Sequence, residues 1–111
     1  MSTYSKEEVI SRIEKVLRST LGLGADVELR PDANLLTEIG LDSIEAFEAV
    51  TTLHEILGVR IPDDLDPKMV ANINGMADYI FDKYGPDVVE KFMTTDIERA
   101  IAEMRADESL D

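Results

Sequence analysis

A chain of 111 residues with 24 acidic and 11 basic side chains carries a formal net charge of −13, which opposes binding to nucleic acids and anionic membranes. It has no cysteine, which excludes disulfides, thiolate metal sites and catalysis by a protein thiol. No apolar run approaches the roughly 18 residues that span a bilayer, and the N-terminus lacks a signal peptide's layout. We therefore expect a cytoplasmic protein without membrane insertion.

The first predicted helix begins after Ser5, because Ser5 and Glu8 have the spacing of a capping box. Gly22 and Gly24 are expected to end it, since glycine readily adopts the left-handed conformation of a helix terminus. Its apolar residues recur at helical spacing: Val9, Ile10, Ile13, Val16, Leu17 and Leu21.

Residues 22–42 show no clear periodicity and include Pro31. A loop of this length is uncommon unless it is functional or packs on itself. We expect it to be pinned across the helices by five apolar residues: Leu29, Leu35, Leu36, Ile39 and Leu41.

The second predicted helix starts at Asp42 or Ser43, where Asp42 and Glu45 again have capping-box spacing, and Gly58 closes it. We expect one apolar stripe, made of Ile44, Phe47, Val50, Leu53 and Leu57. A short third helix follows Asp66 and Pro67, which have the pattern of a cap and a first-turn proline. A fourth carries Ile73, Met76, Ala77, Ile80 and Tyr84, and Gly85 and Pro86 stop it.

The remaining residues, 85–111, have a helical pattern and form one or two additional helices. Their apolar residues are Val89, Met93, Ile97, Ile101 and Met104, and Thr95 with Glu98 offers another capping box. The pattern predicts an all-α fold: a four-helix antiparallel bundle with a long first loop in residues 1–84, followed by a helical extension in residues 85–111. Because the extension is acidic, we expect it to pack on the first or fourth helix rather than the acidic second one.

Ser43 is the candidate functional residue. The segment Gly40-Leu41-Asp42-Ser43-Ile44 places its hydroxyl at the first turn of a helix, where unpaired amides and the helix dipole favour a phosphate ester. The alternative is that Ser43 simply caps the helix, a common role for serine.

The neighbourhood of Ser43 favours the functional interpretation. Residues 35–64, LLTEIGLDSIEAFEAVTTLHEILGVRIPDD, resemble the acyl carrier protein family. The likeness consists of the hydrophobic loop end, the G-x-D-S motif, the acidic second helix, and the exit at Ile61, Pro62 and Asp63. It extends over residues 5–84 and implies the family's four-helix bundle.

The resemblance implies that 4'-phosphopantetheine from coenzyme A is attached to Ser43 by a magnesium-dependent phosphopantetheinyl transferase, with Asp42 orienting the transfer. The protein would then be a carrier and no enzyme, holding acyl groups as thioesters in fatty-acid, polyketide or specialised metabolism. An aminoacyl or peptidyl carrier, and an unmodified acidic interaction protein, remain alternatives. The extension beyond residue 84 departs from the family and favours a specialised pathway.

Residues 38–66 hold eight acids and one base, a local charge of −7. Glu45, Glu48 and Glu55 fall within about 80° of one another on the second helix. Such a face can simply be solvated, but in the family the equivalent face docks basic patches on acyl-loading and acyl-processing enzymes. We expect Glu45, Glu48 and Glu55 to dock such enzymes in this protein as well, and we expect the protein to be a monomer.

The remaining candidates are weaker. His54 is eleven residues from Ser43, about 16 Å along the helix, so the two cannot form a catalytic dyad, and His54 is expected to be partly exposed. Met69, Met76, Met93 and Met104 are interpreted as core or half-buried residues. The acids Asp63, Asp64 and Asp66 lack the spacing of a calcium-binding loop, so no dedicated metal site is expected.

Overall fold

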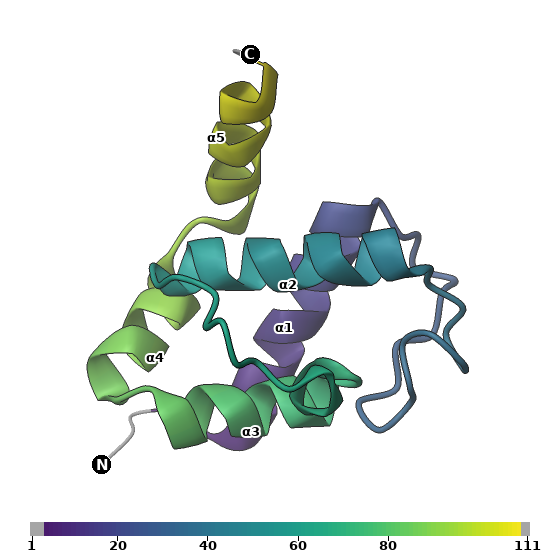
Figure 1. Ribbon diagram of the computed structural model, residues 1–111, viewed down its shortest axis with the longest axis horizontal. Coiled ribbons are helices and arrows are strands. Elements are labelled where there is room, and N and C mark those ends of the chain that lie inside the picture. The colour runs from purple at the N-terminus through teal and green to yellow at the C-terminus, as the bar shows by residue number, and fades with distance from the viewer. Residues whose placement is uncertain (1–3, 110–111) are drawn as a thin grey trace.

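The computed structural model describes residues 4–109, and the side chains of residues 4–106. Within that range the chain is helical and forms no strand (Figure 1). The helices are α1 (Lys6–Leu21), α2 (Ser43–Leu57), the 3-10 helix η1 (Pro67–Val70), α3 (Ile73–Lys83), α4 (Pro86–Thr94) and α5 (Ile97–Ser109). The predicted all-α fold with added C-terminal helices is confirmed. In the described part no helix is both long and apolar enough to cross a membrane.

The helix ends follow the chemistry of the sequence. The capping box of Ser5 and Glu8 forms at the start of α1. Gly22 and Gly58 end α1 and α2 with φ values of 64° and 77°, a region that residues with a Cβ avoid. Asp66 caps η1, and the Asn72 side chain accepts the Gly75 N–H at the start of α3. The ends at Ser5, Gly22, Gly58 and Asp66 agree with the prediction, whereas the cap at Asn72 was not predicted.

The loop between α1 and α2 packs across the bundle as expected. The Leu35 N–H donates to Ala71 O and the Asn74 N–H to Pro31 O, both at 2.9 Å, and these bonds join the loop to the start of α3. Leu29, Leu35 and Leu41 are buried. Leu36 differs from the prediction, because 48% of it is exposed.

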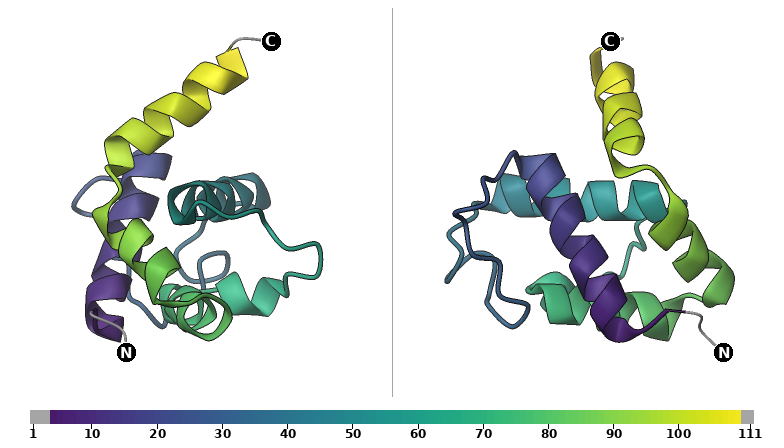
Figure 2. Two further views of the ribbon diagram at one scale, coloured as in Figure 1. Left: turned by 90° about the vertical axis from the view of Figure 1, so that its left-hand side faces the viewer. Right: turned by 180° about the vertical axis from the view of Figure 1, so that it is seen from behind.

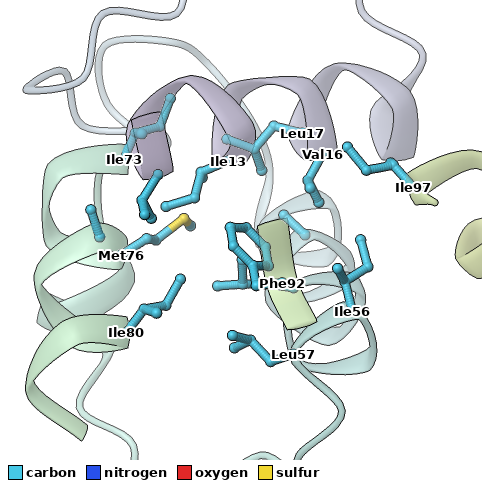
Figure 3. Packing of buried hydrophobic residues seen from close by; sticks show 14 of the residues in the cluster. Ile13, Val16, Leu17, Ile56, Leu57, Ile73, Met76, Ile80, Phe92 and Ile97 are labelled. Carbon is cyan, nitrogen blue, oxygen red and sulfur yellow. The ribbon is translucent and has the colours of Figure 1, made fainter. Parts of the chain in front are cut away.

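The hydrophobic core lies between α1, α2, α3 and α4. α1 packs against both α2 and α3. Phe92 of α4 is fully buried and lies among side chains of the other three helices (Figure 3). The apolar face of α4 is formed by Val89 and Phe92, whereas Met93 is only half-buried. The predicted stripe included Met93 and omitted Phe92.

The predicted Thr95–Glu98 capping box is wrong. The extension bends between α4 and α5, and here the Asp96 side chain accepts the Arg99 N–H at 3.1 Å. The Thr95 hydroxyl instead donates to Lys91 O. The prediction treated residues 89–104 as one continuous helical stripe. Because the chain bends between α4 and α5, the buried positions of α4 do not continue the spacing of those in α5.

The extension packs on α1, as expected, but the prediction that it avoids α2 is wrong. Both α4 and α5 contact α2, and α5 also contacts α1 (Figures 1 and 2). The contact is possible because buried residues such as Ala49 and Ile56 belong to the same core cluster as Phe92, while the acids Glu48 and Glu55 remain exposed. Local apolar contact therefore outweighs the repulsion between the net charges of the two segments.

The guanidinium group of Arg12 holds the extension to α1. It donates to the carbonyl oxygens of Phe92 and Thr95 at the C-terminal end of α4. Further along, the Ser19 hydroxyl donates to Glu98 and Arg105 donates to Thr20 O. Cationic donors at a helix C-terminus satisfy carbonyls that lack partners within the helix.

Candidate functional site

Ser43 is the first residue of α2, and its side chain is exposed. The cap of α2 is Asp42, whose carboxylate accepts the Glu45 N–H at 2.7 Å while the Glu45 carboxylate accepts the Asp42 N–H at 3.1 Å. The Ser43 hydroxyl makes no hydrogen bond within residues 4–109. The alternative in which Ser43 caps the helix is therefore wrong, because Asp42 has that role.

The helix start also provides a favourable electrostatic setting for Ser43. The first-turn amides that the capping box leaves unpaired, together with the dipole of α2, stabilise a negative group at this end by about 0.3–1 kcal/mol when it is exposed. Gly40, with a φ of 92°, makes the turn that leads into this start. The site can therefore hold a phosphate ester on an accessible hydroxyl.

The apolar stripe predicted for α2 is only partly buried. Val50, Leu53 and Leu57 are buried, but Ile44 is 75% and Phe47 68% exposed. The residues that replace them on the buried face are Ala49, Thr52, His54 and Ile56. The surface next to Ser43 is therefore apolar, which hydrophobic periodicity missed because it assigns every large apolar residue to the core.

The predicted acidic face lies on the same side of α2 as these exposed apolar residues. Glu48 and Glu55 are exposed, while Glu45 is half-buried by its role in the capping box. Ile44, Phe47, Glu48 and Glu55 together form a mixed ridge along α2, which we call the α2 ridge. A protein that approaches Ser43 along α2 meets both carboxylates and apolar side chains.

A cavity of about 260 Å³ lies beside α2, and we call it the α2 cavity. Ala46, Phe47 and Val50 form its α2 wall, and Ala46 and Phe47 are three and four residues after Ser43, on the same side of the helix. Its other walls come from the first loop and from the segment around η1: Asn34, Leu35, Leu36, Ile61, Leu65, Pro67, Val70 and Ala71. Apart from Asn34 these side chains are apolar.

His54 is buried, which corrects the prediction that it is partly exposed. It is 2% exposed, and its Nε2 lies 2.7 Å from the Tyr79 hydroxyl while its Nδ1 lies 2.8 Å from Val50 O. The Tyr79 hydroxyl in turn lies 3.1 Å from that of Tyr84. Burial lowers the pKa of His54 and raises that of Tyr79. His54 is therefore part of a polar link between α2 and α3 and is separate from Ser43.

The four methionines that were predicted to be core or half-buried residues differ in their exposure. Met76 is buried in the core, Met93 and Met104 are half-buried, and Met69 is 49% exposed. The acids Asp63, Asp64 and Asp66 are exposed, and Asp66 accepts the Lys68 N–H. Among the described residues no three acidic or histidine side chains gather closely enough to hold a metal ion.

Residues 11–80 match the family model described as "Phosphopantetheine attachment site". The chain is 29% identical over 75 residues to a protein of Nitratidesulfovibrio vulgaris named "Acyl carrier protein", a match that covers 68% of this chain and 96% of the relative. Proteins with the same name from Guillardia theta (25% identical, 71% of this chain and 95% of the relative) and Acidothermus cellulolyticus (29%, 68% and 88%) also match. No solved structure matches the chain. The family match ends within α3, so α4 and α5 lie beyond it.

Proposed function

Because the chain belongs to the acyl carrier protein family, whose prosthetic group is 4'-phosphopantetheine, we propose that Ser43 is the residue that carries this group. The observation that supports the proposal is the free, exposed hydroxyl at the start of α2, next to a residue that already caps the helix. When bound, the group supplies a thiol that holds an acyl group as a thioester. The chain itself has no cysteine that could compete for the acyl group.

We propose that Asp42 has two roles in this site. Its carboxylate keeps the first turn of α2 formed through the Glu45 N–H, which fixes the direction of the neighbouring Ser43. As an exposed carboxylate it can also help to orient the transfer by a magnesium-dependent phosphopantetheinyl transferase, since magnesium prefers oxygen ligands.

The α2 cavity supports an acyl cargo over an aminoacyl one. Its walls are apolar apart from Asn34. An aliphatic chain can therefore leave water there without burying polar groups that lack hydrogen-bond partners. The charged amine of an aminoacyl group would find no carboxylate in this lining. Fatty-acid, polyketide and other specialised acyl pathways all remain compatible with an apolar cavity.

The α2 ridge is the surface that we propose for docking acyl-loading and acyl-processing enzymes. Glu48 and Glu55 would attract basic patches, with Glu45 adding charge from the edge of the ridge. Ile44 and Phe47 would supply apolar contacts, which the sequence had not suggested. A partner surface with a basic patch around a small apolar pocket would complement the carboxylates and apolar side chains of the α2 ridge.

We further propose that residues 1–84 form the carrier domain of a cytoplasmic monomer and residues 85–111 an extension specific to a specialised pathway. The end of the family match at residue 80 supports this boundary. Because α4 contributes Phe92 to the core, the two parts would fold as one unit.

The proposed attachment is tested by mass measurement. Wild-type protein and Ser43→Ala are each incubated with coenzyme A, magnesium and a broad-specificity phosphopantetheinyl transferase. We expect wild type to gain one phosphopantetheinyl group and Ser43→Ala to gain none. Modified Ser43→Ala would show that the site is wrong, and unmodified wild type would favour the unmodified interaction protein.

A further inference from the structure

The segment between α2 and α3 separates two cavities. One side of residues 61–70 lines the α2 cavity through Ile61, Leu65, Pro67 and Val70. The other side lines a second cavity of about 460 Å³ through Pro62, Asp64, Leu65 and Met69. We call this second space the α3 cavity, because α3 forms its far wall with Gly75, Asp78, Tyr79, Asp82 and Lys83.

Leu65 is the residue that the two linings share within the described part of the chain. It is half-buried, and its backbone N–H donates to Pro62 O at 3.2 Å in a turn. It lies on the connection between α2 and η1, outside the helices that the structure describes. Leu65 therefore borders both the α2 cavity, beside the helix that begins at Ser43, and the larger α3 cavity.

We propose that Leu65 is the specificity-determining residue that limits how long an acyl chain the protein can enclose. The proposal rests on the proposed function, in which the chain enters the α2 cavity from Ser43. Each methylene that leaves water adds a similar stabilisation until the cavity is full. The next methylene then meets the Leu65 side chain, and a longer chain must displace it to continue into the α3 cavity.

The α3 cavity is lined by both apolar and charged residues. Its apolar part comes from Leu65, Met69 and the ring of Tyr79. Asp64, Asp78, Asp82 and Lys83 supply charge elsewhere in the lining, and Asp78 pairs with Lys6 at 2.7 Å. A plain alkyl end therefore fits beside Leu65, whereas carboxylates in the lining oppose a chain that ends in an anion. The cargo class is an aliphatic acyl group of limited length whose end carries no anion.

The test compares wild type, Leu65→Ala and Leu65→Phe, each carrying saturated acyl chains of graded length on the attached arm. The measured quantity is the midpoint of thermal unfolding as a function of chain length. We expect the stabilisation of wild type to reach a plateau, that of Leu65→Ala to continue to longer chains, and that of Leu65→Phe to stop earlier. Met69→Ala is the matched control, because Met69 lines the α3 cavity alone and should leave the wild-type plateau in place.

A second measurement needs no attached arm. Free n-alkanols of graded length are titrated into unmodified protein while backbone amide shifts are followed by NMR. In wild type we expect shifts at Val50 with short alkanols and at Tyr79 only with long ones, whereas Leu65→Ala should show both with shorter alkanols. The same response in wild type and Leu65→Ala would overturn the role of Leu65 whether or not Ser43 carries the arm.

Discussion

At the scale of single residues, the division of roles between Asp42 and Ser43 decides the interpretation of the site. Both residues are good helix caps, and the sequence alone left either possible. The structure assigns the cap to Asp42 through its bond to the Glu45 N–H, so the neighbouring hydroxyl is free. The same arrangement makes it possible to separate the structural and chemical roles of Asp42.

Asparagine caps a helix about as well as aspartate but has no charge. We expect Asp42→Asn to keep the free energy of unfolding close to that of wild type while it slows phosphopantetheinyl transfer to Ser43. Asp42→Ala should also lose about 0.5–2 kcal/mol of stability, because the cap is removed. Chemical denaturation and a mass-based transfer assay measure the two effects. If Asp42→Asn is modified at the wild-type rate, Asp42 acts through helix structure alone.

His54 shows what the sequence could not provide at this scale. From the sequence it was expected to be a partly exposed helix residue, whereas it is 2% exposed. The Tyr79 hydroxyl decided the outcome, because it satisfies a buried ring nitrogen. Tyr79 is 25 residues away on another helix, and no local pattern relates the two.

The burial of His54 predicts how stability depends on pH. Burial lowers the pKa of His54 in the folded protein, whereas its pKa in the unfolded chain is about 6.5. At pH values between these two pKa values, the unfolded protein therefore binds more protons than the folded protein. This contribution to stability is therefore complete above about pH 6.5 and is lost as pH falls through the folded pKa. The groups facing His54 are Tyr79 and, through it, Tyr84 and Asp64.

We expect the free energy of unfolding of wild type to fall on acidification below about pH 6.5 more steeply than that of His54→Gln. Urea denaturation at a series of pH values measures both slopes. The variant is the control, because it differs from wild type at residue 54 alone. Parallel curves would show that His54 has the same pKa in the folded and unfolded states.

At the scale of elements, α2 combines features that the sequence predicted with others that it could not. Its bounds and capping box follow from local chemistry and were predicted correctly. The exposure of Ile44 and Phe47 was not, because a periodic pattern cannot show where the rest of the chain leaves a helix uncovered. The uncovered part lies next to Ser43, the residue that we propose carries the prosthetic group.

The α2 ridge predicts salt-dependent docking. We expect Glu48→Lys combined with Glu55→Lys to slow acyl loading and to weaken its dependence on ionic strength, because the attraction to basic patches is screened by salt. Stability should change by about 0.5 kcal/mol or less, since both side chains are exposed. Loading rates across a salt series measure the effect.

The matched control reverses two exposed acids that are not part of α2, Glu28→Lys with Glu90→Lys, and has the same net charge. If docking depends on the α2 ridge, this control loads like wild type at every ionic strength. Equal slowing in both double variants would mean that net charge, rather than the α2 ridge, governs the encounter.

At the scale of the whole molecule, the extension belongs to the core. The sequence predicted that residues 85–111 are helical and need a surface to pack on, and the structure agrees for the part that it describes, where α4 and α5 pack on the bundle. It did not identify Phe92 as the residue that enters the centre, because the bend before α5 shifts the helical phase. Gly58 shows how close the approach is, since a Cβ there would overlap the Lys91 side chain.

The two phenylalanines Phe92 and Phe47 allow stability and function to be tested separately. Phe92 is fully buried among three other helices, so Phe92→Ala should cost about 3–5 kcal/mol. That loss would lower the thermal midpoint of a domain of this size by at least about 12 °C. Phe47→Ala removes the same ring from an exposed position and should change stability by about 0.5 kcal/mol or less.

Loading by an acyl-transferring partner should respond in the opposite order. At a temperature where both variants are folded, Phe47→Ala is expected to load slowly and Phe92→Ala at close to the wild-type rate, because Phe47 lies on the α2 ridge and Phe92 does not. Truncation after Tyr84 should resemble Phe92→Ala and also expose apolar surface. A truncated protein that melts at the wild-type temperature, together with free amide hydrogen exchange of residues 86–104 in the full chain, would show that the extension contributes nothing to the core.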